Sequence, residues 1–335
     1  MNLGPVFCRV ALCSAGLAFL PSAVAQDLPA RFEAGRVYVL PRTPDGQVLK
    51  LYTDSGGGQA LTQSAVTRLH LADGPATDPE LRAELGPGAK VSALPAFASE
   101  AAIPPSSQTV FPIVPRFAEM PGWPDQGDGL VGQAWFAGHI WTWDYPAARL
   151  RLEIAGFRPP LDARSVPLGF KTDAKGARET SFPRIIIDVD GRALPMLLDT
   201  GAETYLTPQA LVALGDNGPA LRATSMIAAS TFESWKKHHP DWRVITKAQV
   251  GTKADMIEVP AVEIAGFRTG PVWFTERSDA SFHKFMSSMM SGQVEGSLGG
   301  NALSRFVMTV NYPAGRAWFA CRAGCLETSK SRERP

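Results

Sequence analysis

The chain has 335 residues, of which 45% are hydrophobic, and this is enough for one large core or two smaller ones. Its formal net charge of +1 gives no reason to expect a nucleic acid or an acidic partner. The 28 prolines and 31 glycines indicate a turn-rich, strand-rich protein, and we expect an all-β fold.

The first 25 residues have the pattern of an export signal. Arg9 precedes an apolar run from Val10 to Leu20, and Ala23-Val24-Ala25 has the small-x-small pattern of a signal peptidase site. We predict a signal peptide over residues 1–25 and a periplasmic or secreted mature chain. A transmembrane anchor is the alternative, but the apolar run is too short to span ~30 Å of hydrocarbon. No other segment predicts a membrane span, so we expect no membrane contact after cleavage.

The mature chain contains a tandem repeat. The stretch "PDGQVLKLYTDSGGGQALTQSAV" is echoed by "VDGRALPMLLDTGAETYLTPQAL" at a constant offset (199 − 54 = 145). Further along, "DGLVGQAWFAGHIWTWDYPAAR" is echoed by "EGSLGGNALSRFVMTVNYPAGR" (296 − 129 = 167). Matching pairs include Asp45/Asp190, Asp54/Asp199, Gly56/Gly201, Thr62/Thr207, Ala65/Ala210, Gly129/Gly296 and Thr142/Thr309. Since the motifs keep their order, we interpret the chain as a duplication.

The repeat defines the expected domains. We place an N-terminal half at residues 26–160, a Pro-, Lys- and Arg-rich linker at 161–181, a C-terminal half at 182–326 and a disordered tail at 327–335. Asp45-Gly46 and Asp190-Gly191 each predict a type I′ hairpin between apolar strands. A further hairpin is expected to turn at Pro313-Ala314-Gly315, and "GGNALSRF" predicts a short helix.

Both copies end an apolar strand with a carboxylate. Asp54 is followed by Ser55 and Gly56, and Asp199 by Thr200 and Gly201. An unpaired ionised carboxylate away from water costs several kcal/mol, so a compensating partner is expected. If the two copies face each other about a pseudo-twofold axis, the carboxyls come within hydrogen-bond distance and share one proton. One carboxylate can then activate water while the other polarises a peptide carbonyl.

These residues resemble the aspartic peptidases. "LLDTGA" is similar to the active-site loop of the retroviral-type (retropepsin-like) family, and "SLGG" and "LVGQ" resemble its later hydrophobic-Gly motif. The arrangement of two copies in one chain resembles the bilobal pepsin architecture. The resemblance implies two pseudo-symmetric acid-protease β-barrel lobes and an aspartic endopeptidase that cleaves a peptide or protein substrate, without cofactor or metal.

The resemblance also assigns roles to residues of this chain. It implies that Asp199 and Asp54 are the catalytic pair, that Thr200 and Ser55 bond across the two loops, and that Gly201 and Gly56 allow the loops to approach closely. Ala202 and Glu203 align with positions that contact the substrate backbone.

The first copy departs from the family pattern at Thr53, where an apolar residue is usual, and at Gly57 and Gly58, which replace Ala202 and Glu203. Pepsins usually carry a hydroxyl at the positions of Gly57 and Ala202, where it stabilises the ionised outer carboxylate. This chain lacks that hydroxyl in both copies, so the resemblance implies a less acidic pH optimum than that of pepsin.

Two other groups of reactive side chains occur in the chain. Cys321 and Cys325 remain after signal cleavage, and in an oxidising compartment we expect them to form a disulfide that stabilises little. Metal binding by this pair is the alternative, although no nearby histidine completes four ligands. His238 and His239 are adjacent, so they cannot face one ligand from a helix or strand, and we expect a solvated loop.

Three alternatives to a single-chain peptidase stay open. The Asp-Ser-Gly and Asp-Thr-Gly stretches can be simple turns. The chain can be a non-catalytic peptide-binding protein with a degenerate first half. Two copies of the chain can also pair their Asp199 residues in a homodimer, although we favour a monomer.

Overall fold

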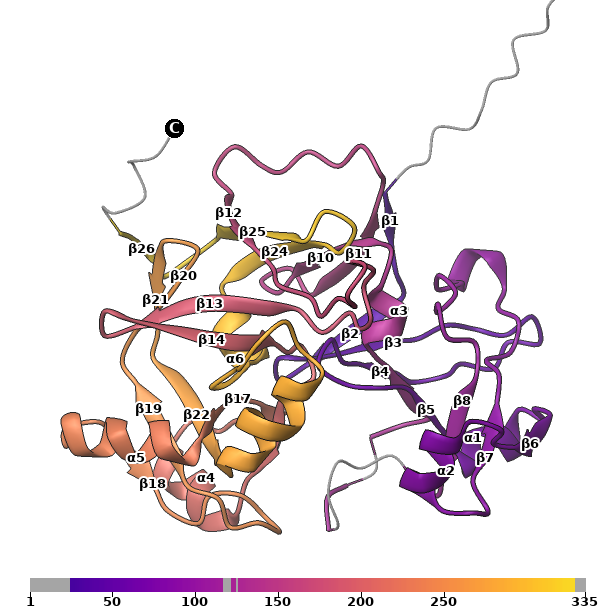
Figure 1. Cartoon of the computed structure of the whole chain (residues 1–335), viewed down its shortest axis with the longest axis horizontal. Coiled ribbons are helices and arrows are strands. Elements are labelled where there is room, and N and C mark those ends of the chain that lie inside the picture. Colours follow the sequence, from indigo (N-terminus) through magenta and orange to yellow (C-terminus); the bar gives the residue numbers. More distant parts are fainter. Residues whose placement is uncertain (1–24, 117–121, 125, 329–335) are drawn as a thin grey trace, which may run out of the picture.

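The computed structural model describes residues 25–116, 122–124 and 126–328, and these residues fold mostly into β-sheet (Figure 1). The predicted signal peptide, apart from Ala25, and the predicted tail beyond residue 328 lie outside this range, and both stay predictions. Across the described ranges, no helix is long and apolar enough to cross a membrane.

Three sheets carry nearly all the strands. The first half forms an eight-stranded sheet in the order β2 (Ala30–Glu33), β3 (Arg36–Val39), β4 (Leu51–Thr53), β9 (Gly129–Val131), β5 (Ala60–Thr62), β8 (Phe111–Val114), β7 (Lys90–Ser92) and β6 (Asp73–Pro75). The second half forms a ten-stranded sheet in the order β18 (Val244–Ile245), β19 (Met256–Val259), β22 (Val272–Arg277), β17 (Ser225–Ala228), β23 (Gly296–Leu298), β14 (Arg192–Leu198), β13 (Arg184–Val189), β20 (Val262–Ile264), β21 (Phe267–Thr269) and β26 (Leu326–Glu327).

The third sheet joins the two halves. It has six strands in the order β1 (Gln26–Asp27), β11 (Arg149–Glu153), β10 (Ile140–Asp144), β24 (Phe306–Asn311), β25 (Arg316–Cys321) and β12 (Arg164–Pro167). Its central pair, β10 and β24, runs antiparallel and aligns Thr142 with Thr309, two positions that match in the repeat. A small separate sheet pairs β15 (Glu203–Tyr205) with β16 (Leu221–Ala223).

Short helices lie between the strands. They are α1 (Gln63–Arg68), α2 (Pro79–Leu85), the 3-10 turn η1 (Ser99–Ala101), α3 (Gln133–Phe136), α4 (Pro208–Leu214), α5 (Ala229–His238), the π-helix η2 (Ala280–Met286) and α6 (Gly300–Leu303). The repeat explains two of their starting points. Thr62 and Thr207 cap α1 and α4, because each hydroxyl accepts a hydrogen bond from the amide three residues on, that of Ala65 or Ala210.

The two large sheets share a strand order. The run β3-β4-β9-β5-β8-β7 in the first half has the same sequence of parallel and antiparallel pairs as β13-β14-β23-β17-β22-β19 in the second. One difference is local. In the first half β5 directly follows the Asp54 loop, whereas in the second half the hairpin-like pair β15–β16 lies between the Asp199 loop and β17.

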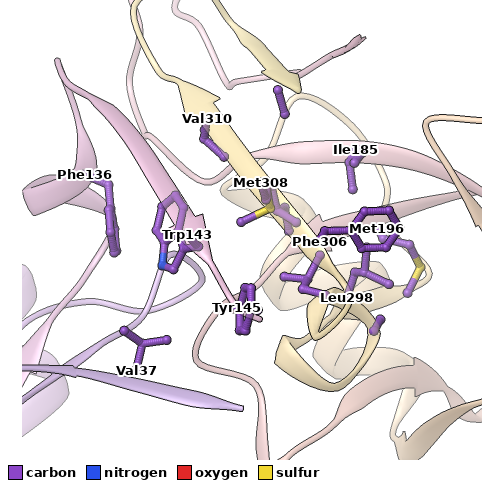
Figure 2. Packing of buried hydrophobic residues seen from close by; sticks show 14 of the residues in the cluster. Val37, Phe136, Trp143, Tyr145, Ile185, Met196, Leu298, Phe306, Met308 and Val310 are labelled. Atoms are coloured by element: carbon purple, nitrogen blue, oxygen red, sulfur yellow. The ribbon is translucent and has the colours of Figure 1, made fainter. Parts of the chain in front are cut away.

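One hydrophobic core extends through both halves (Figure 2). Phe136 and Trp143 from the first half belong to the same buried cluster as Phe306 and Met308 from the second. The ring of Phe136 stacks on that of Tyr312 with 6.0 Å between centroids. Because fully burying each large apolar side chain contributes about 1.5–3 kcal/mol, the junction is a major part of the stabilising core.

Of the two predicted Asp-Gly turns, one is confirmed and the other is wrong. Asp190 and Gly191 both have positive φ, 53° and 79°, as a type I′ turn requires, and they connect β13 to β14. In the other copy Gly46 has φ 91° but Asp45 does not have positive φ. Asp45 instead accepts a hydrogen bond from the hydroxyl of Thr43, so a side-chain-stabilised turn replaces the expected type I′ turn.

Two predicted boundaries also differ from the structure. The expected linker, 161–181, contains β12, which pairs with β25 at one edge of the joining sheet. The expected tail includes Glu327, but this residue lies in β26, opposite Phe267. In both places a short polar segment pairs with the edge strand of a sheet. Such pairing depends on a distant part of the chain, so the local sequence pattern does not predict it.

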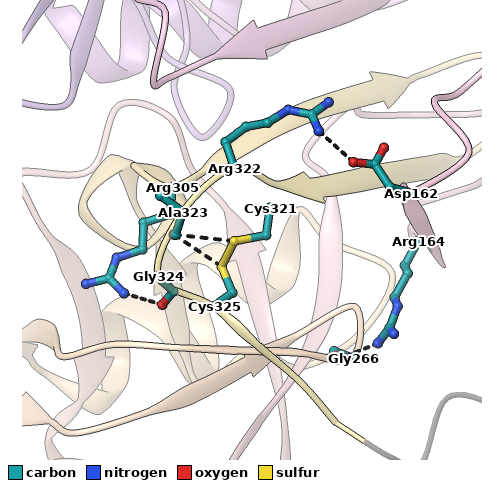
Figure 3. The surroundings of a disulfide bond; sticks show 9 residues. All are labelled: Asp162, Arg164, Gly266, Arg305, Cys321, Arg322, Ala323, Gly324 and Cys325. Atoms are coloured by element: carbon teal, nitrogen blue, oxygen red, sulfur yellow. Dashed lines mark hydrogen bonds and ion pairs between the residues drawn. A yellow bond between two sulfur atoms is a disulfide. The ribbon is translucent and has the colours of Figure 1, made fainter.

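The cysteine pair forms a disulfide between Cys321 and Cys325 (Figure 3). Around it, Arg305 donates a hydrogen bond to the carbonyl of Gly324, and Arg322 forms an ion pair with Asp162 at 2.6 Å. The hydrogen bond holds the disulfide loop against the start of β24, and the ion pair holds the end of β25 against the segment that precedes β12. The bond closes a short loop at the edge of the apolar core, where Cys321 lies opposite Phe306 and both cysteines pack against the core cluster.

Candidate active site

The two aspartates of the repeat occupy equivalent places at the ends of β4 and β14. Each of these strands runs parallel to the strand of the hydrophobic-Gly motif, β9 or β23. The amide of Asp54 donates to the carbonyl of Val131 and that of Asp199 to the carbonyl of Leu298, both at 3.0 Å. The second motif therefore fixes the position of each aspartate by a backbone hydrogen bond.

Reciprocal hydrogen bonds join the two aspartate loops. The amide of Ser55 donates to the hydroxyl of Thr200 at 3.1 Å, and the amide of Thr200 donates to the hydroxyl of Ser55 at 2.9 Å. The Ser55 hydroxyl in turn donates to the carbonyl of Leu198 at 2.7 Å. All these groups are buried, so leaving any of them unpaired would cost about 1–3 kcal/mol.

The glycines after the aspartates are required by space. A Cβ at Gly56 would lie 2.6 Å from Cγ of Asp199, and a Cβ at Gly201 would lie 2.1 Å from Cγ of Asp54. Gly57 is equally restricted, because a Cβ there would lie 2.3 Å from Oδ2 of Asp54. No side chain fits between each loop and the opposite carboxyl, and Gly57 thus has a steric role in the first half.

The Asp54 and Asp199 side chains form a hydrogen-bonded pair. Asp199 is buried, with 9% of its surface exposed, whereas Asp54 is half-buried. The amides of Gly56 and Gly201 donate to Oδ1 of Asp54 and Asp199, at 2.7 and 3.1 Å. Burial raises the pKa of Asp199, and the hydrogen bond with Asp54 opposes that rise only in part. Two carboxyls in this relation hold a proton between them.

Thr53 is polar and buried, and a backbone carbonyl satisfies its hydroxyl. Its hydroxyl donates to the carbonyl of Val37 at 3.0 Å. The preceding residue, Tyr52, reaches across to the other half, and its hydroxyl donates to the carbonyl of Gly201 at 2.9 Å. Tyr52 was missed in the sequence, although its spacing of two from Asp54 on a strand places both side chains on one face.

Ala202 and Glu203 are buried, with 3% and 1% of their surfaces exposed, so their side chains do not lie at an open surface. Glu203 accepts a hydrogen bond from the side-chain amide of Gln126 and lies 3.7 Å from the guanidinium of Arg36. Burial raises the pKa of Glu203 to about 7. Sequence patterns gave no signal for Arg36 or Gln126, because both are distant from Glu203 along the chain.

A cavity of about 840 Å³ lies beside the first aspartate loop. It is lined by Gly58, Gln59 and Ala60 of that loop and strand, and by apolar side chains that include Leu81 and Leu130. Gly58 is the repeat counterpart of Glu203, so one side of the aspartate pair is open where the other is filled.

Within the described part of the chain, neither the cysteines nor the histidines build a metal site. Among the residues whose positions are described, no group of three or more His, Cys, Asp or Glu side chains is arranged to hold a metal ion. His239 stacks on Trp242 with 4.0 Å between ring centroids, and its Nε2 lies 3.3 Å from Asp190.

Comparison with known proteins adds little beyond this geometry. No protein-family model and no curated protein sequence matches the chain. Among solved structures, an aspartic proteinase from Irpex lacteus is similar over 90% of this chain and 98% of its own, with 11% sequence identity and a TM-score of 0.45. At that level of likeness the match assigns neither an activity nor a site to this chain.

Proposed function

We propose that this chain is an exported, single-chain aspartic endopeptidase that hydrolyses peptide bonds with Asp54 and Asp199. The observation that carries the proposal is the hydrogen-bonded contact between these two carboxyls, contributed by matching positions of the repeat. Simple turns do not require two distant aspartates to meet, nor glycines at each point of approach.

The proposed chemistry follows from the different surroundings of the two carboxyls. Asp199, with its raised pKa, holds the shared proton, and Asp54 is the ionised partner. Asp54 takes a proton from water as the water oxygen attacks the peptide carbon, while Asp199 gives its proton to the carbonyl oxygen. Asp54 then passes its proton to the departing nitrogen, the C–N bond breaks, and a hydroxyl of the diol returns a proton to Asp199.

The fold supports a bilobal arrangement around this pair. The matching strand orders of the two large sheets favour two pseudo-symmetric lobes of acid-protease type. The cavity beside Gly58 has room for a part of an extended peptide next to Asp54. Because both aspartates come from one chain, the proposal needs no second copy. The disulfide suits an oxidising compartment, in line with a periplasmic or secreted location.

The departures that favoured a non-catalytic peptide-binding protein now have local explanations. Thr53 is hydrogen-bonded to the backbone, and Gly57 avoids a clash with Asp54. Of the departures in the first copy, only Gly58, the counterpart of Glu203, is left without such an explanation.

The test is cleavage of a denatured protein by the mature chain, with and without pepstatin. We expect wild type to cleave, and both Asp54→Asn and Asp199→Asn to lose nearly all activity. Asp190→Asn is a matched control, because Asp190 lies in an exposed turn at φ 53° that asparagine tolerates. Loss in Asp199→Asn alone would support a homodimeric site, and no cleavage by folded wild type would support the peptide-binding protein.

A further inference from the structure

A buried polar cluster lies next to the aspartate pair on one side only. Its members come from both halves of the chain and are Arg36, Tyr38, Tyr52, Gln126 and Glu203. The repeat counterparts of Tyr52 and Glu203 are Leu197 and Gly58, which have no polar side-chain group. The cluster is therefore an addition to one side of the site and not part of the repeated framework.

Glu203 is only partly neutralised within this cluster. Its Oε2 lies 3.7 Å from Nη1 of Arg36, but Arg36 also lies 3.7 Å from the carboxylate of Glu33. Nη1 of Arg36 donates to the hydroxyl of Tyr38 at 2.6 Å, which is a shorter contact than the one to Glu203. Glu33 has a closer cation of its own, Lys50, whose Nζ lies 3.0 Å from Oε2 of Glu33. Arg36 stays 3.7 Å from Glu203, and Oε2 of Glu203 has no hydrogen-bond partner among the described residues, so no close partner fixes the protonation state of this buried carboxyl.

The hydroxyl of Tyr52 connects Glu203 to the catalytic loop. It donates to the carbonyl of Gly201 at 2.9 Å, and it lies close enough to the Glu203 side chain to lower the pKa of that carboxyl. A hydroxyl has one proton to donate. A protonated Glu203 donates to the Tyr52 oxygen and leaves the Tyr52 proton for Gly201. An ionised Glu203 is the stronger acceptor, because charge-assisted hydrogen bonds are roughly twice as strong as neutral ones.

We propose that the protonation state of Glu203 controls the position of the Asp199 loop through the hydroxyl of Tyr52, and this inference rests on the proposed function. Protonated Glu203 leaves the Tyr52–Gly201 hydrogen bond intact, and ionised Glu203 withdraws it. Tyr52 and Glu203 are positioning residues in this scheme, since the reacting groups are Asp54 and Asp199.

The charged and titratable surroundings agree with this assignment. Burial raises the pKa of Glu203 to about 7, and Gln126, Arg36 and Tyr52 lower it only in part. Among the groups that face the cluster, Glu33 lies 3.7 Å from Arg36 and 3.0 Å from Nζ of Lys50, and that ammonium lies 4.0 Å from the centre of the Tyr38 ring. Burial raises the pKa of the Tyr52 phenol, and the nearby Glu203 and Asp54 carboxyls raise it further. From the second half, β16 places Ala223 opposite Glu203 and adds no charge there.

The first arm of the test measures kcat/KM between pH 4 and pH 9 for wild type, Glu203→Gln, Tyr52→Phe and the double variant. We expect wild-type activity to fall as pH rises through about 7, and this decline to be absent from Glu203→Gln and from Tyr52→Phe. The double variant should be no less active than Tyr52→Phe. Tyr38→Phe, which removes a hydroxyl of the same cluster that does not contact Gly201, should keep the decline.

The second arm does not depend on peptidase activity. The amide nitrogen of Ala202 belongs to the peptide group of Gly201, so its NMR shift reports on the hydrogen bond to that carbonyl. We expect this resonance to titrate near pH 7 in wild type and Tyr38→Phe, and to be unchanged in Glu203→Gln and Tyr52→Phe. A resonance that does not titrate in wild type, or still titrates in Tyr52→Phe, would overturn the inference. Titration without cleavage would reject the proposed function alone.

Discussion

At the scale of single residues, space around the aspartates is the tightest constraint. We predict that Gly201→Ala lowers peptidase activity at least about 100-fold, because a misplacement of about 1 Å in a reacting group can cost that much. The added Cβ would lie 2.1 Å from Cγ of Asp54, so one loop must shift. Gly88→Ala is the control, since a Cβ there meets nothing within 4 Å. Kinetics on both variants, with circular dichroism to verify folding, check the prediction.

Glu203 makes a second residue-scale prediction, on stability. Its pKa is about 7 in the folded chain against an ordinary 4.5, so folding favours the protonated form. This contribution is fully present below pH 4.5 and is lost as pH rises through 7. The loss amounts to about 3 kcal/mol, from 1.36 kcal/mol per pKa unit.

The measurement is the free energy of urea unfolding between pH 4 and pH 8 for wild type and Glu203→Gln. The wild-type value should decline relative to the variant over that interval. Parallel curves would mean that Glu203 titrates at its ordinary pKa, in spite of its burial.

At the scale of elements, strands β10 and β24 meet through two threonines that match in the repeat. The hydroxyls of Thr142 and Thr309 lie 2.7 Å apart and are buried. We expect Thr142→Val or Thr309→Val to cost about 1–3 kcal/mol, because each leaves the other hydroxyl unpaired. The double variant should cost less than the two singles together, which a double-mutant cycle of unfolding free energies measures. Additive costs would show that the two hydroxyls do not interact.

The elements also show what the sequence can and cannot predict. The turn at Asp190-Gly191 could be predicted from the sequence, because both residue types tolerate the positive φ that the turn requires. The same dipeptide at 45–46 does not form the predicted type I′ turn. There the hydroxyl of Thr43 donates a hydrogen bond to the Asp45 carboxylate, and this bond stabilises a different turn. Pairing of β12 with β25 was unpredictable, since Arg164–Pro167 has no strand pattern and is held by contacts with distant segments, such as the hydrogen bond from Arg164 to the carbonyl of Gly266.

The candidate site likewise contains residues that the sequence could predict and contacts that it could not. Asp54, Asp199 and their following glycines could be identified, because the repeat marks both copies at one offset. Glu203 could be singled out, but not its burial, which depends on Arg36 and Gln126 from the other half. Contacts of that kind arise only when the two halves dock, so a single sequence contains no local trace of them.

At the scale of the whole molecule, the halves share both a sheet and a core. Strands β10 and β11 of the first half lie in one sheet with β24 and β25 of the second, and the apolar cluster includes Trp143 as well as Phe306 (Figure 2). Neither half can keep these groups buried without the other. We therefore predict that the chain unfolds as one cooperative unit, without a populated state in which a single half is folded.

Native-state hydrogen exchange checks this prediction directly. Amides of β4 and β14 lie in different halves, yet they should exchange with the same opening free energy, equal to that of global unfolding. Ile257→Val, at a buried position of β19 whose strand partners Val244 and Phe274 also belong to the second half, should lower both values by the same amount. If the amides of β4 kept their wild-type protection in that variant, the halves would be separate folding units, and the aspartate pair would then depend on a docking equilibrium between them.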